Sequence, residues 1–470
     1  MKRFLAFFLT LIMILSLIAC SKAEVNNETS TDTASDSSEK AVSDAALYIA
    51  DLPGMDLKGR EYRIATDNAS LILPQNGTNY VGKKIYERNA AVEKKYNVKI
   101  VLTEESGLPS IGERIRMEAL SGSDYCDLAL VSATACQQLV LADSLQNVSS
   151  IPYLSTSGEG VFPDASSAFT LGNTVYGLCG DFCYSADGVY VVYFNKKLAE
   201  ATGLPDLYQL VRDNQWDQEN FQLYSEEAFS LGRINGQKIY GFTSSERAET
   251  LLQTFWAASD LKYVDNPYGG KPSLAYDSSA IRDGFINQSR KILYKSVAFL
   301  NNTSASEEAF RDGQVLFYIA PIGKVTNLSG AAADWGLLPM PVYDINQNSR
   351  RSYQDLDFQI VCFPKGIADI DFSGQVAQAL FCASQGLSRD LALTQYVNLH
   401  LRSSEDGEML KIVLQEPYFD PTEFFGSVYP EYISSTQTVI QRVVSSEGNY
   451  AQLYKQYSTM FEKFVQEKVS

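Results

Sequence analysis

The chain has 470 residues, and its 39 lysines and arginines stand against 56 aspartates and glutamates, which gives a formal net charge of −17. This acidic excess argues against nucleic-acid binding, because phosphates are neutralised by a basic surface. The single histidine, His400, excludes a zinc site built from several histidines. Any Ser-His-Asp or Cys-His catalytic group would have to use that residue. The length, with 45% hydrophobic residues, predicts two or three folded domains.

The N-terminus has the pattern of a secretory signal peptide. Lys2 and Arg3 give it a positive start, and residues 4–19 form an apolar run that is short for a membrane span. The run ends in Leu-Ile-Ala-Cys (17–20), which resembles the lipobox of bacterial lipoproteins. This resemblance implies that residues 1–19 are removed and that Cys20 carries lipid. An uncleaved anchor helix is the alternative.

Residues 21–45 contain mainly Ser, Thr, Asp, Glu and Ala and have no aromatic residue. Such a sequence cannot bury enough apolar surface to offset the entropy lost on folding. We therefore expect residues 20–52 to form a flexible tether. Six cysteines follow Cys20, an even number that permits disulfides in an exported protein. Cys179 and Cys183, in the sequence CGDFC, are a possible disulfide, and buried free thiols are the alternative.

The first folded part alternates predicted strands and helices. Residues 61–66 alternate polar and apolar side chains, which predicts a strand, and apolar spacings of three and four predict a helix over 80–96. A strand over 98–102, a helix over 111–121 and a strand over 127–131 follow. This order predicts an α/β unit with a parallel sheet, which binds ligands beyond the carboxyl ends of its strands.

A second α/β region begins near residue 175. We expect its strands over 189–194, 239–242, 315–319 and 358–363, its helices over 195–201, 245–260, 276–296 and 304–312, and a mostly helical remainder over 373–470.

The order of these segments resembles the family 1 extracellular solute-binding proteins of ABC importers, which are mostly sugar binders. The matching segments are NAAVEKKYNVKI (89–100), VVYFNKKLAEATGLP (191–205), LYQLVRDNQWDQENF (207–221), AFRDGQVLFYIAPIG (309–323), WGLLPMPVYD (335–344) and LRSSEDGEMLKIVL (401–414). The resemblance implies the two-lobed, type II periplasmic-binding-protein-like α/β fold, in which a hinge lets the lobes close on ligand. It places lobe I in residues 53–175 and 317–360, and lobe II in residues 176–316 and 361–470.

The same resemblance implies a function without catalysis and without a cofactor. The protein would be a monomer on the outer face of the cytoplasmic membrane, held there by the lipid on Cys20. It would capture a carbohydrate, in particular an oligosaccharide, and deliver it to the permease of an ABC importer. A lipid-anchored polysaccharide-active enzyme and a receptor for a non-sugar solute are the alternatives.

Related proteins bind sugars with polar side chains at strand ends and with aromatic rings, so the resemblance also implies candidate ligand contacts. Trp256 lies in the helix where related proteins place a stacking aromatic residue, although it could equally belong to the core. Asn68 could equally be a turn former. The remaining candidates follow a predicted strand, approach the hinge or, in the case of Asp187, precede the strand over 189–194. The set besides Trp256 is Asp67, Asn68, Ser132, Thr134, Asp187, Tyr353, Asp355 and Asp357.

Two acidic patterns admit other interpretations. If Asp355 and Asp357 lie on one strand, they share a face about 7 Å apart, within the carboxylate separations that glycosidases use. They would then lie side by side, however, and not on opposite sides of a bond. A partial calcium-loop pattern begins at Asp344, but Ser349 replaces its turn glycine. A plain surface loop is the alternative there, and we expect no bound metal.

Overall fold

The computed structural model describes residues 56–74, 80–103, 110–267, 269–276 and 280–469. The predicted signal peptide, the predicted lipidation site Cys20 and the predicted tether lie outside the described residues. Within the described part, no helix is long and apolar enough to cross a membrane.

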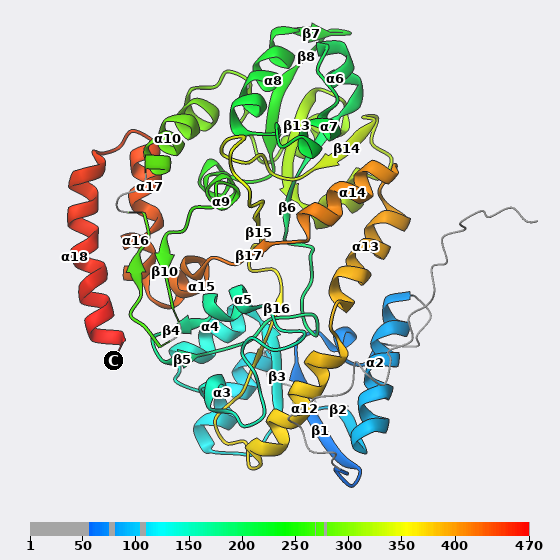
Figure 1. Ribbon diagram of the computed structural model, residues 1–470, viewed down its shortest axis with the longest axis vertical. Helices are drawn as coiled ribbons and strands as arrows, with labels where there is room; N and C mark the ends of the chain where they lie inside the picture. Colours follow the sequence, from blue (N-terminus) through cyan, green and yellow to red (C-terminus); the bar gives the residue numbers. More distant parts are fainter. Residues whose placement is uncertain (1–55, 75–79, 104–109, 268, 277–279, 470) are drawn as a thin grey trace, which may run out of the picture. The chain divides into compact units, whose positions relative to one another are not determined.

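The first of two central sheets has four strands in the order β16-β3-β1-β2 (Figure 1). β1 (Arg60–Thr66) is parallel to β2 (Val98–Leu102) and to β3 (Leu128–Ser132). β16 (Gln359–Cys362) joins the edge antiparallel to β3, although it lies more than 200 residues later in the chain. The three parallel strands confirm the predicted α/β unit.

Two predicted helices connect these strands with the expected bounds, α2 (Tyr80–Tyr96) and α3 (Ile111–Ser121). The ends of α3 follow from local chemistry. The hydroxyl of Ser110 accepts a hydrogen bond from the amide of Glu113 (3.2 Å), which caps the first turn. Gly122, at φ 70°, ends the helix in the left-handed region that favours glycine.

Two further helices cover the first sheet region. α4 (Ala133–Leu141) contacts β3 and β16, and α12 (Ile370–Ala383) packs against α2. Figure 1 shows α12, drawn in yellow, beside the strands of this sheet, so a late segment of the chain returns to the first region.

The second sheet has five strands in the order β12-β9-β13-β6-β14. Its strands are β6 (Tyr190–Asn195), β9 (Tyr240–Ser244), β12 (Phe299–Leu300), β13 (Val315–Pro321) and β14 (Trp335–Leu338). β13 is the central strand, parallel to β9 and antiparallel to β6. Every β13 residue except the last is buried, as expected of a strand covered on both faces.

The sheets differ from the expected division of the chain. Residues 317–360 were expected in lobe I, but β13 and β14 both belong to the second sheet with β6. The expected lobe II segment 361–470 also differs, since α12 packs on α2 and β16 ends at Cys362 in the first sheet. The physical reason is that a buried strand must have its backbone hydrogen bonds satisfied on both edges, and β9 and β6 satisfy those of β13.

Two segments connect the sheets. We call residues 176–189, between β5 and β6, the first linker, and residues 339–358, between β14 and β16, the second linker. Isolated bridges join Leu178 to Val361 and Val189 to Gln354. The first linker therefore runs beside the second linker and β16.

The remaining elements are mostly short strands and helices. They are α5 (Pro163–Ala168), β4 (Thr170–Leu171), β5 (Thr174–Val175), α6 (Lys196–Thr202), α7 (Leu207–Arg212), α8 (Gln218–Ser230), β7 (Arg233–Ile234), β8 (Gln237–Lys238), α9 (Ala248–Ala258), β10 (Val264–Asp265), β11 (Ser273–Leu274), α10 (Ala280–Ser289), a π-helix η4 (Arg290–Lys295), α11 (Ser306–Arg311), β15 (Ser352–Tyr353), α13 (Leu387–Leu399), α14 (Ser404–Val413), β17 (Pro417–Tyr418), α15 (Pro421–Val428), α16 (Pro430–Ser435), α17 (Gln437–Val444) and α18 (Tyr450–Lys468), with 3-10 turns η1 (Ala69–Leu71), η3 (Val148–Ser150) and η5 (Ile322–Leu328).

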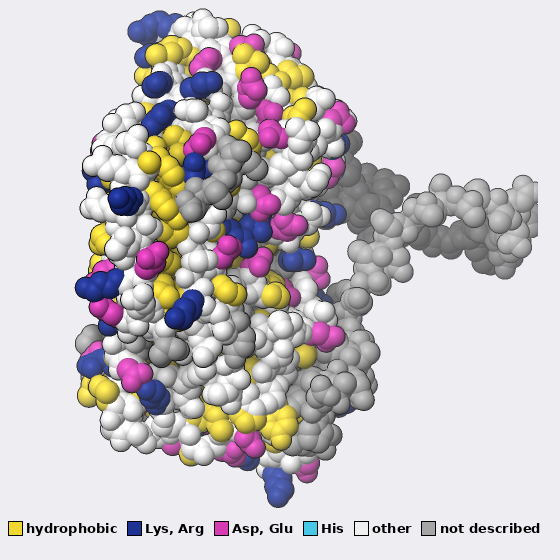
Figure 2. All heavy atoms as spheres, turned by 60° about the vertical axis from the view of Figure 1, so that its left-hand side comes forward, with side chains coloured by type: hydrophobic (Ala, Val, Ile, Leu, Met, Phe, Trp, Pro, Cys, Tyr) yellow, Lys and Arg dark blue, Asp and Glu magenta, His cyan; other side chains and the backbone are white. Residues whose placement is uncertain are grey.

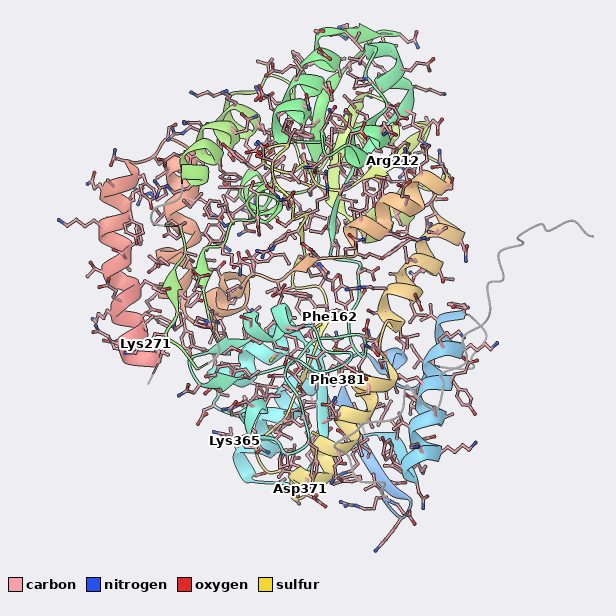
Figure 3. All side chains as sticks on the ribbon, in the orientation of Figure 1. Phe162, Arg212, Lys271, Lys365, Asp371 and Phe381 are labelled. Carbon is pink, nitrogen blue, oxygen red and sulfur yellow. The ribbon has the colours of Figure 1, made fainter. Side chains whose placement is uncertain are left out.

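Aromatic side chains pack around the first linker. Phe182 contacts Phe381 of α12 with ring centroids 5.8 Å apart, and Tyr184 contacts Phe162 at 5.2 Å. Phe162 and Phe381 are labelled in Figure 3, where both lie near the middle of the drawing. The surface is of mixed charge on the face drawn in Figure 2, where basic and acidic side chains are interspersed. The acidic excess is therefore not gathered into one patch on that face.

Candidate functional site

A cavity of about 260 Å³ is enclosed by the loop after β1, by α2 and α13, and by the two linkers. It lies beyond the carboxyl end of β1, where parallel sheets bind their ligands. Polar side chains and aromatic rings line it together: Asn68, Asp181, Phe182, Tyr184, Ser185, Asp187, Asp357, Phe358, Gln359, Ser388, Gln395 and Tyr396. Three predicted contacts, Asn68, Asp187 and Asp357, are thus in one lining.

The two candidates in the loop after β1, Asp67 and Asn68, have different roles. Asn68 lines the cavity and is half-buried, and its Oδ1 accepts a hydrogen bond from the hydroxyl of Ser70 (2.6 Å). Asp67 is not part of the lining; its Oδ2 accepts a hydrogen bond from the amide of Ser132 (3.1 Å). Ser132 caps α4, and Thr134 is exposed on the first turn of that helix. The loop thus presents Asn68 to the cavity while Asp67 ties β1 to the end of β3.

Asp187 connects the first linker to α13. Its carboxylate is exposed, lines the cavity and accepts a hydrogen bond from the hydroxyl of the buried Tyr396. Burial, and then the charge of Asp187, raise the pKa of Tyr396, so this phenol stays protonated and acts as a donor. Sequence reasoning missed Tyr396, since a tyrosine on a helix does not stand out among 28 in the chain.

Of the three candidates on the second linker, only Asp357 lines the cavity. Asp357 is exposed and lines the cavity, whereas Asp355 is half-buried outside the lining and accepts a hydrogen bond at Oδ1 from the amide of Asp357 (2.9 Å). Burial, with the nearby charges of Asp357, Glu246 and Glu423, raises the pKa of Asp355 to about 7. Tyr353 is buried.

The two aspartates lie between β15 and β16 and not on one strand, so the shared-face geometry considered for a glycosidase is absent there. Tyr353 donates a hydrogen bond to Oε1 of Gln253 (3.4 Å), and its ring packs 5.5 Å from that of Tyr190. It therefore holds the second linker to the second sheet.

Trp256 belongs to the core of this structure. Its side chain has 0% exposure, it is not in the cavity lining, and its ring stacks on Tyr263 with centroids 4.6 Å apart. Phe285 packs against the indole at 5.1 Å. Of the two roles considered for Trp256, ligand contact and core residue, this structure places it in the second. Trp216 and Trp335 are likewise buried, as expected of structural residues.

Sequence reasoning also missed two buried charged residues in the lining. Asp181 accepts hydrogen bonds from the amide of Gly386 (2.8 Å) and the hydroxyl of Ser388, and burial raises its pKa. Arg88, on α2, is 1% exposed. A signal for it was present, because Arg88 is three residues after Ile85 and therefore on the apolar face of the predicted helix.

The described cysteines are all free thiols in this structure. Cys179 and Cys183 are both buried, and burial, followed by a hydrogen bond between the two thiols, raises the pKa of Cys179. Their disulfide therefore stays a prediction. At the partial calcium-loop pattern, Oδ1 of Asp344 accepts a hydrogen bond from the amide of Asn346 (2.7 Å). Within the described ranges, no group of three or more His, Cys, Asp or Glu residues could hold a metal ion.

Comparisons with known proteins bear on the fold and the family. The structure resembles a cyclo/maltodextrin-binding protein solved with maltotetraose (13% identity, 89% of this chain and 100% of that chain, TM-score 0.51). It also resembles UspC of M. tuberculosis (10% identity, 86% and 99%, TM-score 0.54) and a family 1 extracellular solute-binding protein of Bifidobacterium longum subsp. infantis (10% identity, 86% and 100%, TM-score 0.52). These likenesses confirm the fold expected from the sequence.

The curated protein sequences give no significant match. A family profile, described as bacterial extracellular solute-binding protein, matches residues 87–370. That range covers more than half of the chain and includes the whole second sheet and every strand of the first sheet except β1. The chain therefore belongs to the bacterial extracellular solute-binding protein family.

Proposed function

We propose that this protein is a lipid-anchored receptor on the outer face of the bacterial membrane that captures a carbohydrate and delivers it to an ABC importer. The observation that carries the carbohydrate part is the cavity lining. Side-chain amides and carboxylates suited to sugar hydroxyls, on Asn68, Asp187, Asp357 and Gln359, share it with the ring of Phe358. Sugars need both, because their hydroxyls form paired hydrogen bonds and their C–H faces pack on aromatic rings.

Two further observations support the proposal. The similar protein solved with maltotetraose has the same fold, so the fold accommodates an oligosaccharide in at least one relative. The lipobox-like sequence ending at Cys20 supports anchoring, and the family supports an ABC importer as the partner. The cavity, at about 260 Å³, is just below the range of about 300–1,000 Å³ for small-molecule sites. It would hold a small sugar or one end of a longer chain.

The test is a thermal-shift screen of defined mono- and oligosaccharides, followed by mass spectrometry of the recovered sugar. A ligand at a hundredfold excess over its Kd stabilises the folded protein by about 2.7 kcal/mol. We expect at least one sugar to raise the Tm and to be recovered intact. Shortened chains would favour the polysaccharide-active enzyme, and a shift only with non-sugar solutes would favour the other receptor.

Site variants locate the binding. Asn68→Ala and Asp357→Asn should each weaken the affinity for that sugar about tenfold, since each removes hydrogen bonds to a bound polar group. Asp371→Asn is the matched control, because Asp371 is exposed on the first turn of α12 and outside the lining; it is labelled in Figure 3. If all three variants bind the sugar with wild-type affinity, the sugar binds elsewhere.

A further inference from the structure

Arg88 is a buried cation in the wall of the cavity. Its Nε and Nη2 donate to Oδ1 of the neighbouring Asn89 (3.0 and 2.8 Å). Nη2 also donates to the carbonyl oxygen of Leu71 (3.2 Å), and Nη1 donates to that of Phe182 (3.4 Å). The ring of Phe182 lies under the guanidinium, with the centroid 4.8 Å from Cζ. Arg88 is thus held in place by neutral groups.

No carboxylate among the described residues neutralises this charge. A guanidinium has five N–H groups, so these contacts leave one hydrogen of Nη1 without an acceptor. Burial lowers the pKa of Arg88 to about 9, and no nearby carboxylate contributes. The group therefore still carries its charge at neutral pH, in a buried place where an unpaired charge is strongly unfavourable.

The lining has three acidic residues, Asp181, Asp187 and Asp357, and among the described residues none of them pairs with Arg88. Asp181 accepts from Gly386 and Ser388, and Asp187 accepts from Tyr396. The cavity thus contains a fixed cation without a carboxylate partner among the described residues, and an anionic ligand would supply the counter-charge. The same wall is apolar beside Arg88, since Ile85 also lines the cavity from α2. Exclusion of water by such side chains strengthens a charged contact.

We propose that the ligand carries a carboxylate, as a saccharide containing a uronic acid does, and that Arg88 is the residue that receives it. This inference rests on the proposed function, because it names the class of sugar that the same cavity selects. A carboxylate accepting from Nη1 would form a charge-assisted hydrogen bond, the strong kind that arginine makes with carboxylates. Arg88 would then be a specificity-determining residue.

The experiment compares an oligogalacturonate with its methyl ester, which has the same rings without the charge. Isothermal titration calorimetry on the wild-type protein should give about 10- to 100-fold tighter binding of the acid. Added salt should weaken the binding of the acid and leave the binding of the ester unchanged. Equal affinity for acid and ester, or preference for the ester, would overturn the inference.

A variant series then assigns the effect to Arg88. Arg88→Gln should lose the preference for the acid and keep the affinity for the ester, and Arg88→Lys should retain part of the preference. Arg212→Gln is the control, since Arg212 on α7 is partly exposed and pairs with Glu408 (2.7 Å) (Figure 3). An unchanged preference in Arg88→Gln would contradict the assignment.

The outcomes separate this inference from the proposed function. If only neutral sugars bind, the inference is wrong and the proposed function stands. If no sugar binds, both are wrong. If Arg88→Gln does not fold, the comparison of acid with ester on the wild-type protein still decides the inference, because it needs no variant.

Discussion

The backbone amide of Asp355 donates a hydrogen bond to the carbonyl oxygen of Gly188 (3.1 Å), which joins the second linker to the first. The contact continues on both sides. Val189 and Gln354 form an isolated bridge, and the hydroxyl of Tyr184 donates to Oε1 of Gln354 (3.1 Å). The two segments that connect the sheets are therefore tied to each other beside the cavity, to which Tyr184 also contributes.

Gly188→Ala should destabilise this contact. A methyl group at position 188 would overlap the carboxylate of Asp355 and the amide of Gln354, both of which are already hydrogen-bonded. We expect a loss of about 1–3 kcal/mol, as for overpacking elsewhere, measured as a lower Tm. Gly407→Ala is the control, because the nearest side-chain atom, on Val397, would lie at an ordinary 3.5 Å. Since alanine favours helix α14, that variant should be neutral or slightly more stable.

The local elements could be predicted from the sequence. The helix over 80–96 and the strand over 98–102 were predicted with the observed bounds, because a period near 3.6 and then a run of β-branched residues are local signals. The pairing of β13 could not be predicted in this way. Its apolar run suits any buried strand, and only the three-dimensional arrangement of β6 and β9 decides which sheet it enters.

The candidate site was predictable only in part, for a similar reason. Asn68 was found because it follows a strand whose carboxyl end faces ligands, and Asp187 because the family resemblance implies an acidic contact before β6. Trp256 lies in a predicted helix with the expected aromatic character, but its burial depends on Tyr263 and Phe285, which no local pattern relates to it. Arg88 was missed although its position on an apolar helix face was visible. A charge in that position indicates either an internal partner or a ligand.

Arg63→Met should destabilise the first sheet strongly. The guanidinium and backbone amide of Arg63 both bind the carboxylate of Asp127, with Nη2 to Oδ1 at 2.8 Å and N to Oδ2 at 2.7 Å. Asp127 is only 6% exposed in its side chain, so the variant leaves a buried carboxylate without its cation. Full burial would give a loss of about 3–5 kcal/mol. Because Arg63 is 31% exposed, we expect about 2–3 kcal/mol.

Urea unfolding measures this effect, with Lys99→Met as the control on the neighbouring strand. Lys99 pairs with Glu61 at 2.9 Å, but both side chains are more than half exposed. Such exposed pairs contribute little to stability because water and salt screen them, so the control should unfold close to the wild-type midpoint. Similar losses in the two variants would contradict the role assigned to the buried Asp127.

Cys20→Ala should abolish lipid attachment. We expect the wild-type protein expressed in bacteria to incorporate a labelled fatty acid and to enter the detergent phase on Triton X-114 partitioning. Each buried CH₂ of an acyl chain contributes about 0.8 kcal/mol to membrane binding, so several chains together anchor stably. The variant should take up no label, and with residues 1–19 replaced by an ordinary secretory signal it should move to the aqueous phase. Label retained in Cys20→Ala would contradict lipidation at this cysteine.

Asp355 should make the protein less stable as the pH rises toward neutrality. Its pKa is raised to about 7 by burial and by nearby carboxylates, against about 3.9 in an unfolded chain. Between these values the folded state holds a proton that the unfolded state has lost, so the free energy of unfolding falls from about pH 4 to pH 7.

Asp355→Asn removes this dependence while its side-chain oxygen can still accept from the amide of Asp357. The variant should therefore have a higher Tm than wild type at pH 8, by about 1–3 °C, and little difference at pH 4. Asp371→Asn, exposed on α12, is the control and should follow the wild-type curve. A constant Tm difference between Asp355→Asn and wild type across this range would show that the carboxyl group of Asp355 does not titrate there.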